Sequence, residues 1–134
     1  MKKWQVAQYL FIALICGYAT QAFAHHGTSV NYDMQTVVTI KGTVTRFVWR
    51  NPHSALILDV TTESGEVISH AVELPSPASM AQRGPVWNRR LFKPGDVIEI
   101  KVHPSRTGAA VSKSAACDLG GCDPLINGEP LRNE

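Results

Sequence analysis

The sequence predicts an all-β fold: a small five-stranded barrel of the oligonucleotide/oligosaccharide-binding (OB) type, with one short helix between strands 3 and 4. Two observations predict it. Most runs after residue 36 alternate apolar and polar residues, which is the period of a half-buried strand. The elements follow the order three strands, a helix start and two more strands, which is that of an OB-type barrel. An immunoglobulin-like sandwich would need about seven strands.

The first predicted strand, residues 37–49, is long and contains a glycine. Gly42 lies in mid-run on the apolar face, where a residue without a side chain permits a bulge or a sharp bend. A long strand coiled at a glycine is what a small closed barrel needs. Asn51-Pro52 then ends the strand, because proline cannot donate to a sheet ladder. The residues predicted to share the apolar face are Val38, Ile40, Val44 and Val48.

The second and third predicted strands form a hairpin. The second run opens at His53, residues 61–66 form a turn that contains Gly65, and the third run covers residues 67–74. The apolar faces are predicted to hold Leu56, Leu58 and Val60 on the second strand, and Ile68, His70, Val72 and Leu74 on the third.

A short helix is predicted after the third strand. Ser76 is placed to cap it and Pro77 to occupy its first position, so that residues 78–83 form two turns. Residues 87–92 are expected to be irregular and to lay aromatic side chains on the core. The fourth strand is predicted over residues 97–102 with His103-Pro104 at its end, the fifth over residues 109–117, and the tail after residue 122 as irregular.

Residues 1–24 are predicted to be a cleaved secretory signal peptide. Lys2 and Lys3 supply the positive start, residues 9–19 form the apolar region, and Ala22 and Ala24 are the small residues that a signal peptidase requires. This apolar region is shorter than the ~20 residues that a bilayer-spanning helix needs, so no membrane anchor is expected after cleavage. The mature protein is therefore expected in the periplasm or outside the cell.

The mature chain, residues 25–134, is expected to be a single domain of zero net charge. Without Lys2 and Lys3, 11 of the 13 basic residues remain, against 11 acidic ones. Binding of DNA or RNA needs a concentrated basic face, so the expected partners are a metal ion or another exported protein rather than nucleic acid. Cys117 and Cys122 are predicted to form a disulfide, because an exported protein meets an oxidising compartment.

Four histidines are candidate metal ligands: His25, His26, His53 and His103. The first two follow the cleavage site, and the other two lie at the ends of predicted strands, which meet at the rims of a barrel. Neutral imidazoles suit copper, zinc, nickel and iron. For the two strand-end histidines a purely structural role fits the pattern equally well, and for His70, among apolar neighbours, a structural role is favoured.

Cleavage after Ala24 would make His25 the first residue of the mature chain. Its free amine, with a pKa of ~8, and its own imidazole would then form a chelate ring. Copper(II) favours such a nitrogen-rich set, and positions would stay open for another imidazole. Recruitment of His26, or cleavage after Ala22, also gives copper affinity with a different geometry. Copper is therefore the expected cofactor.

Three classes of function follow. The leading hypothesis is a periplasmic metal-binding protein, with copper held by the mature N-terminal histidine. The alternative is a non-enzymatic binding module without metal, in which Trp49, Trp87 and Arg50 near the loops hold a peptide, a sugar or a partner. An enzyme is less favoured, because the sequence shows no nucleophile elbow and no Cys-His dyad. Glu73 and Asp59 are strand residues that could orient a histidine.

Short motifs run through the chain in a fixed order: His25-His26-Gly27, Tyr32-Asp33, Lys41-Gly42-Thr43-Val44, Trp49-x-Asn51-Pro52-His53, Arg83-Gly84, Lys93-Pro94-Gly95-Asp96 and His103-Pro104. Through them, over about residues 24–115, the chain resembles a family of small exported bacterial proteins classified only as a domain of unknown function. The resemblance implies export and a single domain, and it implies no activity. The two cysteines of the tail lie outside it.

Overall fold

The computed structural model describes residues 4–5, 27–115 and 123–131 of the chain. The chain divides into two compact units, Met1–Val30 and Asn31–Glu134. Residues 4–5 are helical, and a short helix, α2, covers Gly27–Asn31. Within the described ranges, no helix is both long enough and apolar enough to cross a membrane.

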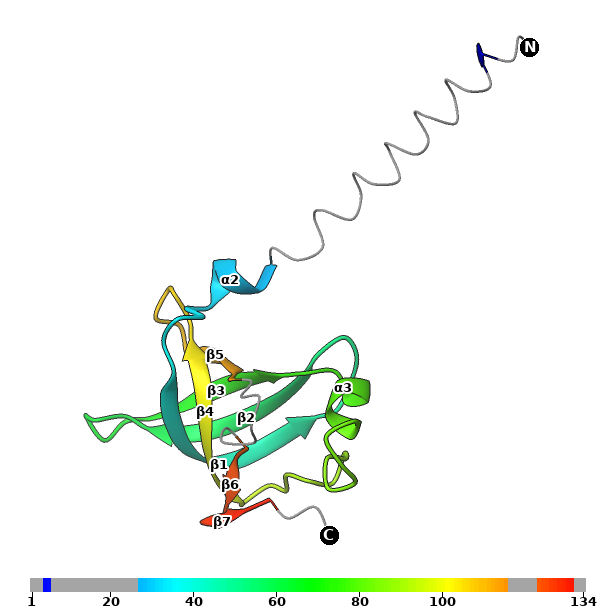
Figure 1. The fold of residues 1–134 in the computed structure, drawn as a ribbon. Coiled ribbons are helices and arrows are strands. Elements are labelled where there is room, and N and C mark those ends of the chain that lie inside the picture. Colours follow the sequence, from blue (N-terminus) through cyan, green and yellow to red (C-terminus); the bar gives the residue numbers. More distant parts are fainter. Residues whose placement is uncertain (1–3, 6–26, 116–122, 132–134) are drawn as a thin grey trace. The chain divides into compact units, whose positions relative to one another are not determined.

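The second unit is a closed barrel of five strands, with two short strands outside the ring (Figure 1). The ring strands are β1 (Val38–Val48), β2 (Ser54–Thr61), β3 (Val67–Leu74), β4 (Val97–Pro104) and β5 (Val111–Ser114). Their order around the ring is β1-β2-β3-β5-β4, and β1 also pairs with β4 to close it. Only β3 and β5 run parallel among the ring neighbours. The predicted all-β barrel, with its helix between the third and fourth strands, is confirmed.

The strand β1 closes the barrel because it pairs with two strands in succession. Its first half, Val38–Thr43, pairs with β4, and its second half, Thr43–Val48, pairs with β2. Gly42 lies at the change of partner, where an added Cβ would be 2.7 Å from the carbonyl oxygen of Asp59. Real Cβ atoms do not approach a backbone oxygen this closely. The glycine is therefore what lets β1 lie so near β2.

A bulge between Val44 and Arg46 changes which side chains of β1 face the core. Before the bulge, Val44 is buried, as predicted. After the bulge, Phe47 packs against the core. Val48 does not belong to the core cluster of the described residues. The prediction that Val48 shares the inner face is therefore wrong, because the extra residue of a bulge shifts the alternation by one position. Val38, at the start of the strand, is 39% exposed.

The other ring strands follow the predicted alternation. The residues that they bury include Leu56, Leu58, Val72, Leu74, Ile98, Ile100 and Val102. His70 faces inward with them, and its Nε2 lies 3.0 Å from Oγ of the buried Ser112. Burial lowers the pKa of His70 and so favours its neutral ring. His70 therefore has the structural role that the sequence favours.

The segment between β3 and β4 begins with the predicted helix, α3 (Pro77–Ala81). Ser76 caps it, because Oγ of Ser76 accepts a hydrogen bond from the backbone N–H of Ser79 at 3.2 Å. The helix ends earlier than residue 83. Trp87 and Phe92 are 5% and 3% exposed, so the aromatic side chains of the following irregular segment cover the core as expected.

The end of the chain departs from the prediction. Residues 123–131 are not irregular, because β6 (Leu125–Ile126) and β7 (Glu129–Pro130) form a hairpin, and β6 pairs with β4. Its turn residues, Asn127 and Gly128, have φ angles of 52° and 85°, the left-handed conformation that a two-residue hairpin turn of this kind requires. Asn127 Oδ1 also accepts a hydrogen bond from the backbone of Val97 at 2.8 Å, which fastens the hairpin to β4.

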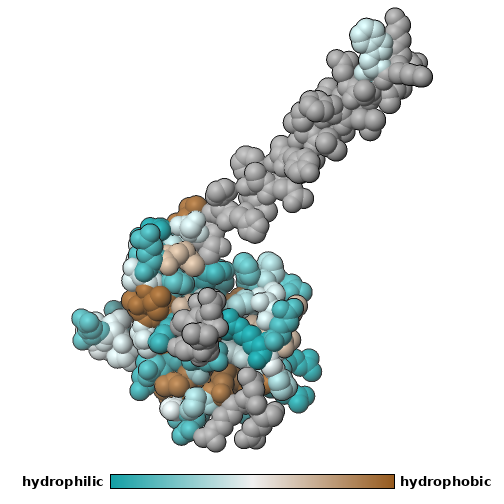
Figure 2. Space-filling model, in the orientation of Figure 1, coloured by the Kyte–Doolittle hydropathy of each residue, from teal (hydrophilic) through white to brown (hydrophobic). Residues whose placement is uncertain are grey.

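Hydrophilic side chains cover most of the barrel face seen in Figure 2, and apolar side chains form separate patches on it. Exposed apolar side chains in the described part of the barrel are mostly valines: Val37, Val38, Val67, Val97 and Val111, with Met34.

We expect the substitution Gly42→Ala to lower the free energy of unfolding by about 1–3 kcal/mol, the usual cost of forcing extra volume into a packed site. The new methyl group must displace Asp59 and Val60 of β2, whose nearest atoms lie 2.7 and 2.9 Å from its position. Urea unfolding measures the loss. The neighbouring exposed position provides the control, since Thr43→Ala adds no atom, and an equal loss in both variants would contradict the steric explanation.

Candidate functional site

Polar side chains from four parts of the chain meet at the carboxylate of Glu73, on the outer face of β3. Lys113 Nζ donates a hydrogen bond to Oε1 at 3.0 Å, and Tyr32 Oη donates one to Oε2 at 3.1 Å. His53 Nδ1 lies 3.1 Å from Oε1. We call Tyr32, His53, Glu73 and Lys113 the Glu73 cluster. The side chains of Glu73 and Lys113 are 27% and 26% exposed, so their charges are only partly screened by water.

The partners of Glu73 decide its charge. Partial burial by itself raises the pKa of this carboxyl, but the hydrogen bond and charge of Lys113, the hydroxyl of Tyr32 and the imidazole of His53 together lower it below its usual range. Burial, with the charge and hydrogen bond of Glu73, raises the pKa of Tyr32 to about 12. At neutral pH the cluster therefore holds an ionised carboxylate and a neutral phenol.

His53 is exposed at the entrance to β2, just after the Asn51-Pro52 pair. Its side chain is 53% exposed, and its Nδ1 faces the carboxylate of Glu73. A carboxylate only accepts hydrogen bonds, so Nδ1 of a neutral His53 carries the proton and Nε2 keeps its lone pair. Histidines that bind metals are commonly oriented by a carboxylate in this way. His53 therefore has the arrangement of a metal ligand, with Glu73 as the group that orients it.

His103 lies on the outer face of β4 opposite Lys113 of β5, but it is covered. It is 8% exposed, and its Nδ1 donates a hydrogen bond to the carbonyl oxygen of Thr36 at 2.9 Å. The segment that covers it is fastened to the end of β4, because the backbone N–H of Asp33 donates to the carbonyl of Pro104. In this structure His103 holds the segment that carries Tyr32.

The predicted site residues are therefore only partly brought together. His53 belongs to the Glu73 cluster, and His103 lies beside it through Lys113. Four of the predicted residues, His25, His26, Cys117 and Cys122, lie outside the described residues. Within the described residues, no three His, Cys, Asp or Glu side chains are grouped so that they could hold a metal ion.

Sequence reasoning named Glu73 as a residue that could orient a histidine, and it named Asp59 equally, although Asp59 is exposed on β2. It did not find Tyr32 or Lys113. Lys113 meets Glu73 because β5 lies parallel to β3 with these two residues in register. No local pattern contains that pairing. The motif Tyr32-Asp33 was the available signal for Tyr32.

The fold and the Glu73 cluster together define a small OB-type barrel with a histidine–carboxylate pair at the entrance to β2. Residues 13–114 match the family described as "Family of unknown function (DUF6152)", and the chain belongs to that family. The resemblance to a family of unknown function is thereby confirmed, and the match begins earlier than residue 24. No curated protein and no solved structure matches the chain.

We expect Glu73→Gln to destabilise the protein at neutral pH, by on the order of 1 kcal/mol for a partly exposed cluster. The pKa of Glu73 is lower in the folded protein than its usual value, so the ionised carboxylate stabilises the fold. This stabilisation is complete at pH values above the usual pKa of a glutamate in the unfolded chain. It is lost as the pH falls through the lowered pKa of Glu73 in the folded protein. Urea unfolding at pH 7 and pH 3 should thus show a smaller difference between variant and wild type at the acidic pH.

The control for this measurement is Glu63→Gln, in the exposed turn between β2 and β3. It should change the stability by less than about 0.5 kcal/mol at both pH values. If the effect of Glu73→Gln does not depend on pH, the ionised cluster is not what stabilises the outer face.

Proposed function

We propose that the protein is exported to the periplasm and binds copper there through its mature N-terminus. Residues 1–24 would be removed as a signal peptide, so that His25 supplies a free amine and an imidazole to the metal. His26 would lie beside it. Cys117 and Cys122 would form a disulfide in that compartment.

The observation that carries this proposal is the orientation of His53 by Glu73. The contact of 3.1 Å between Nδ1 and Oε1 keeps the proton on Nδ1, and the exposed ring leaves Nε2 free to accept a metal. Glu73 is already engaged by Lys113 and Tyr32 and is suited to orienting rather than binding. One oriented imidazole cannot hold copper alone, so the proposal needs the nitrogen donors of the N-terminus.

The proposed donors are close to the Glu73 cluster in the sequence. Tyr32 follows His26 by six residues and contacts the same carboxylate as His53. His103 is the weaker candidate for the remaining position, because it is buried and engaged with Thr36.

The alternative, a binding module without metal, was based on tryptophans near the loops. Trp87 is buried, and Trp49 packs against the core and the ring of Phe47, with a centroid distance of 5.7 Å. Arg50 is exposed. Because both tryptophans contribute to the core, they offer less ligand-binding surface than their positions in the sequence suggest, and the metal proposal has the better support.

The proposal predicts that the chain beginning at His25 takes up about one equivalent of copper(II), measured by calorimetric titration. Acetylation of the His25 amine should reduce the affinity by at least about tenfold, because it removes that amine from the chelate ring. His53→Gln should also weaken binding, and Glu73→Gln should cost about 10–100-fold, as for other groups that orient metal ligands.

The matched control is His70→Gln, which alters a histidine bonded inside the barrel and should leave copper affinity unchanged. Unchanged affinity after acetylation of that amine would falsify the terminal-ligand proposal. The intact mass of the protein isolated from the periplasm shows separately whether cleavage falls after Ala24.

A further inference from the structure

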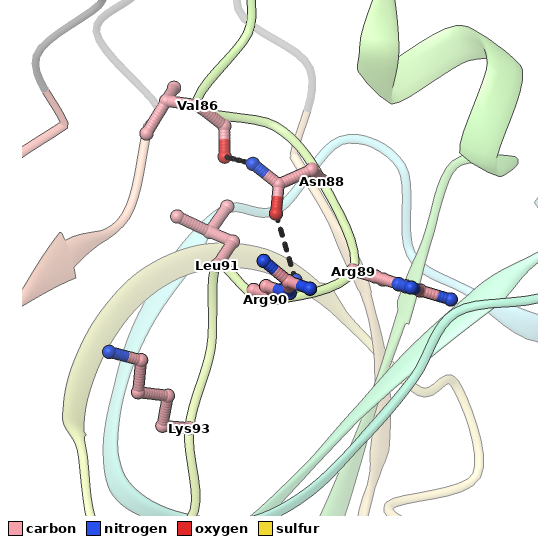
Figure 3. Close-up of a pocket in the computed structure, with 6 residues that line it drawn as sticks. All are labelled: Val86, Asn88, Arg89, Arg90, Leu91 and Lys93. Carbon is pink, nitrogen blue, oxygen red and sulfur yellow. Dashed lines mark hydrogen bonds between the residues drawn. The ribbon is translucent and has the colours of Figure 1, made fainter.

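The segment between α3 and β4 carries three cations around a hollow in the surface. The hollow has a volume of about 630 Å³ and is lined by Val86, Asn88, Arg89, Arg90, Leu91 and Lys93, which we call the basic groove (Figure 3). The side chains of Arg89, Arg90 and Lys93 are exposed, and none of them has an ion-pair partner within the ranges that the structure describes.

The groove is held in place by the residues on either side of Arg89 and Arg90. Trp87 and Phe92 are buried, so both ends of the stretch between them are fixed in the core. Lys93 directly follows Phe92. Asn88 fixes the middle of this stretch: Nδ2 donates to the carbonyl oxygen of Val86 at 3.2 Å, and Oδ1 accepts from the backbone N–H of Arg90 at 2.9 Å (Figure 3). A backbone held in this way loses little entropy when a ligand binds.

Some other cations of the barrel have carboxylate partners. Arg83, in the same segment, lies 3.9 Å from Asp123 and over the ring of Trp87. Lys113 is paired with Glu73. The groove instead places three positive charges within five residues of a chain whose residues 25–134 carry no net charge. The groove is therefore a local surplus of positive charge on a defined backbone.

We propose that the basic groove binds an acidic segment of another polypeptide, with carboxylates against the three cations and an apolar side chain against Val86 and Leu91. In Figure 3, Arg89 and Lys93 extend to opposite sides of the segment with Arg90 between them. Charges spread in this way suit several carboxylates along a chain better than one compact anion, which needs donors that converge. Val86 and Leu91 are half-buried in the hollow, where a peptide side chain reaches them and a flat lipid surface does not.

The test uses a fluorescein-labelled synthetic peptide of glutamate and leucine residues, titrated with the exported protein and followed by fluorescence anisotropy. We expect saturable binding that weakens as salt is added, because the contacts are between exposed charges. The double variant Arg89→Gln/Arg90→Gln should weaken binding about fivefold or more. A peptide with serine in place of leucine should bind less tightly, because it loses the apolar contact.

The charge-matched control is Lys41→Gln/Lys101→Gln, which removes two positive charges from exposed positions on β1 and β4. It should bind the peptide as the wild type does, and thermal unfolding should show that both variants fold. An equal loss in both variants means that only net charge matters, and overturns the proposal. So does the absence of saturable peptide binding, or binding to phosphatidylglycerol vesicles alone. Copper loading is measured separately, so failure of this proposal leaves the metal site unaffected.

Discussion

The strand β1 forms hydrogen bonds with β4 along its first half and with β2 along its second, and the ring closes only because one strand can do both. The change of partner falls at Gly42, where the carbonyl of Asp59 occupies the space that any side chain would need. Closure removes free sheet edges between these strands, which a five-stranded open sheet would expose. It also fixes the register, and so which residues of the strands face inward, with the alternation of β1 shifted by one position at its bulge.

The same register determines which side chains are neighbours on the outer face of the barrel. Across four neighbouring strands the pairing brings Ala55 beside Glu73, Glu73 beside Lys113, and Lys113 beside His103. A carboxylate between a lysine and the histidine that precedes β2 is thus a consequence of how the ring is ordered, not of any local motif. The segment that begins at Tyr32 then covers part of this row, and His103 fastens it through Thr36.

Alternation and turn residues predicted most of the barrel, and they failed where the chain departs from regular strands. The bulge after Val44 placed Phe47 inside and Val48 outside, and no residue type in that stretch signals the extra position. The hairpin at Asn127-Gly128 is different, because Asn-Gly is a strong hairpin signal that the sequence already contained. For the site, His53 and His103 look alike in the sequence, each beside a proline at a strand end. Only the three-dimensional structure shows that the imidazole of His53 is half-exposed and that His103 is 8% exposed.

Both carboxylate oxygens of Glu73 already have partners, and this limits what the described residues could contribute to a metal site. Its two oxygens already receive Lys113, Tyr32 and the Nδ1 side of His53, and a metal on this carboxylate would displace a lysine held at 3.0 Å. In the proposed site the carboxylate would therefore act through His53, by fixing its proton and its direction. Copper affinity at this face would have to come from nitrogen donors added to that one imidazole. The described residues hold no group of three such ligands, so the proposed site would take its first donors from His25 and His26.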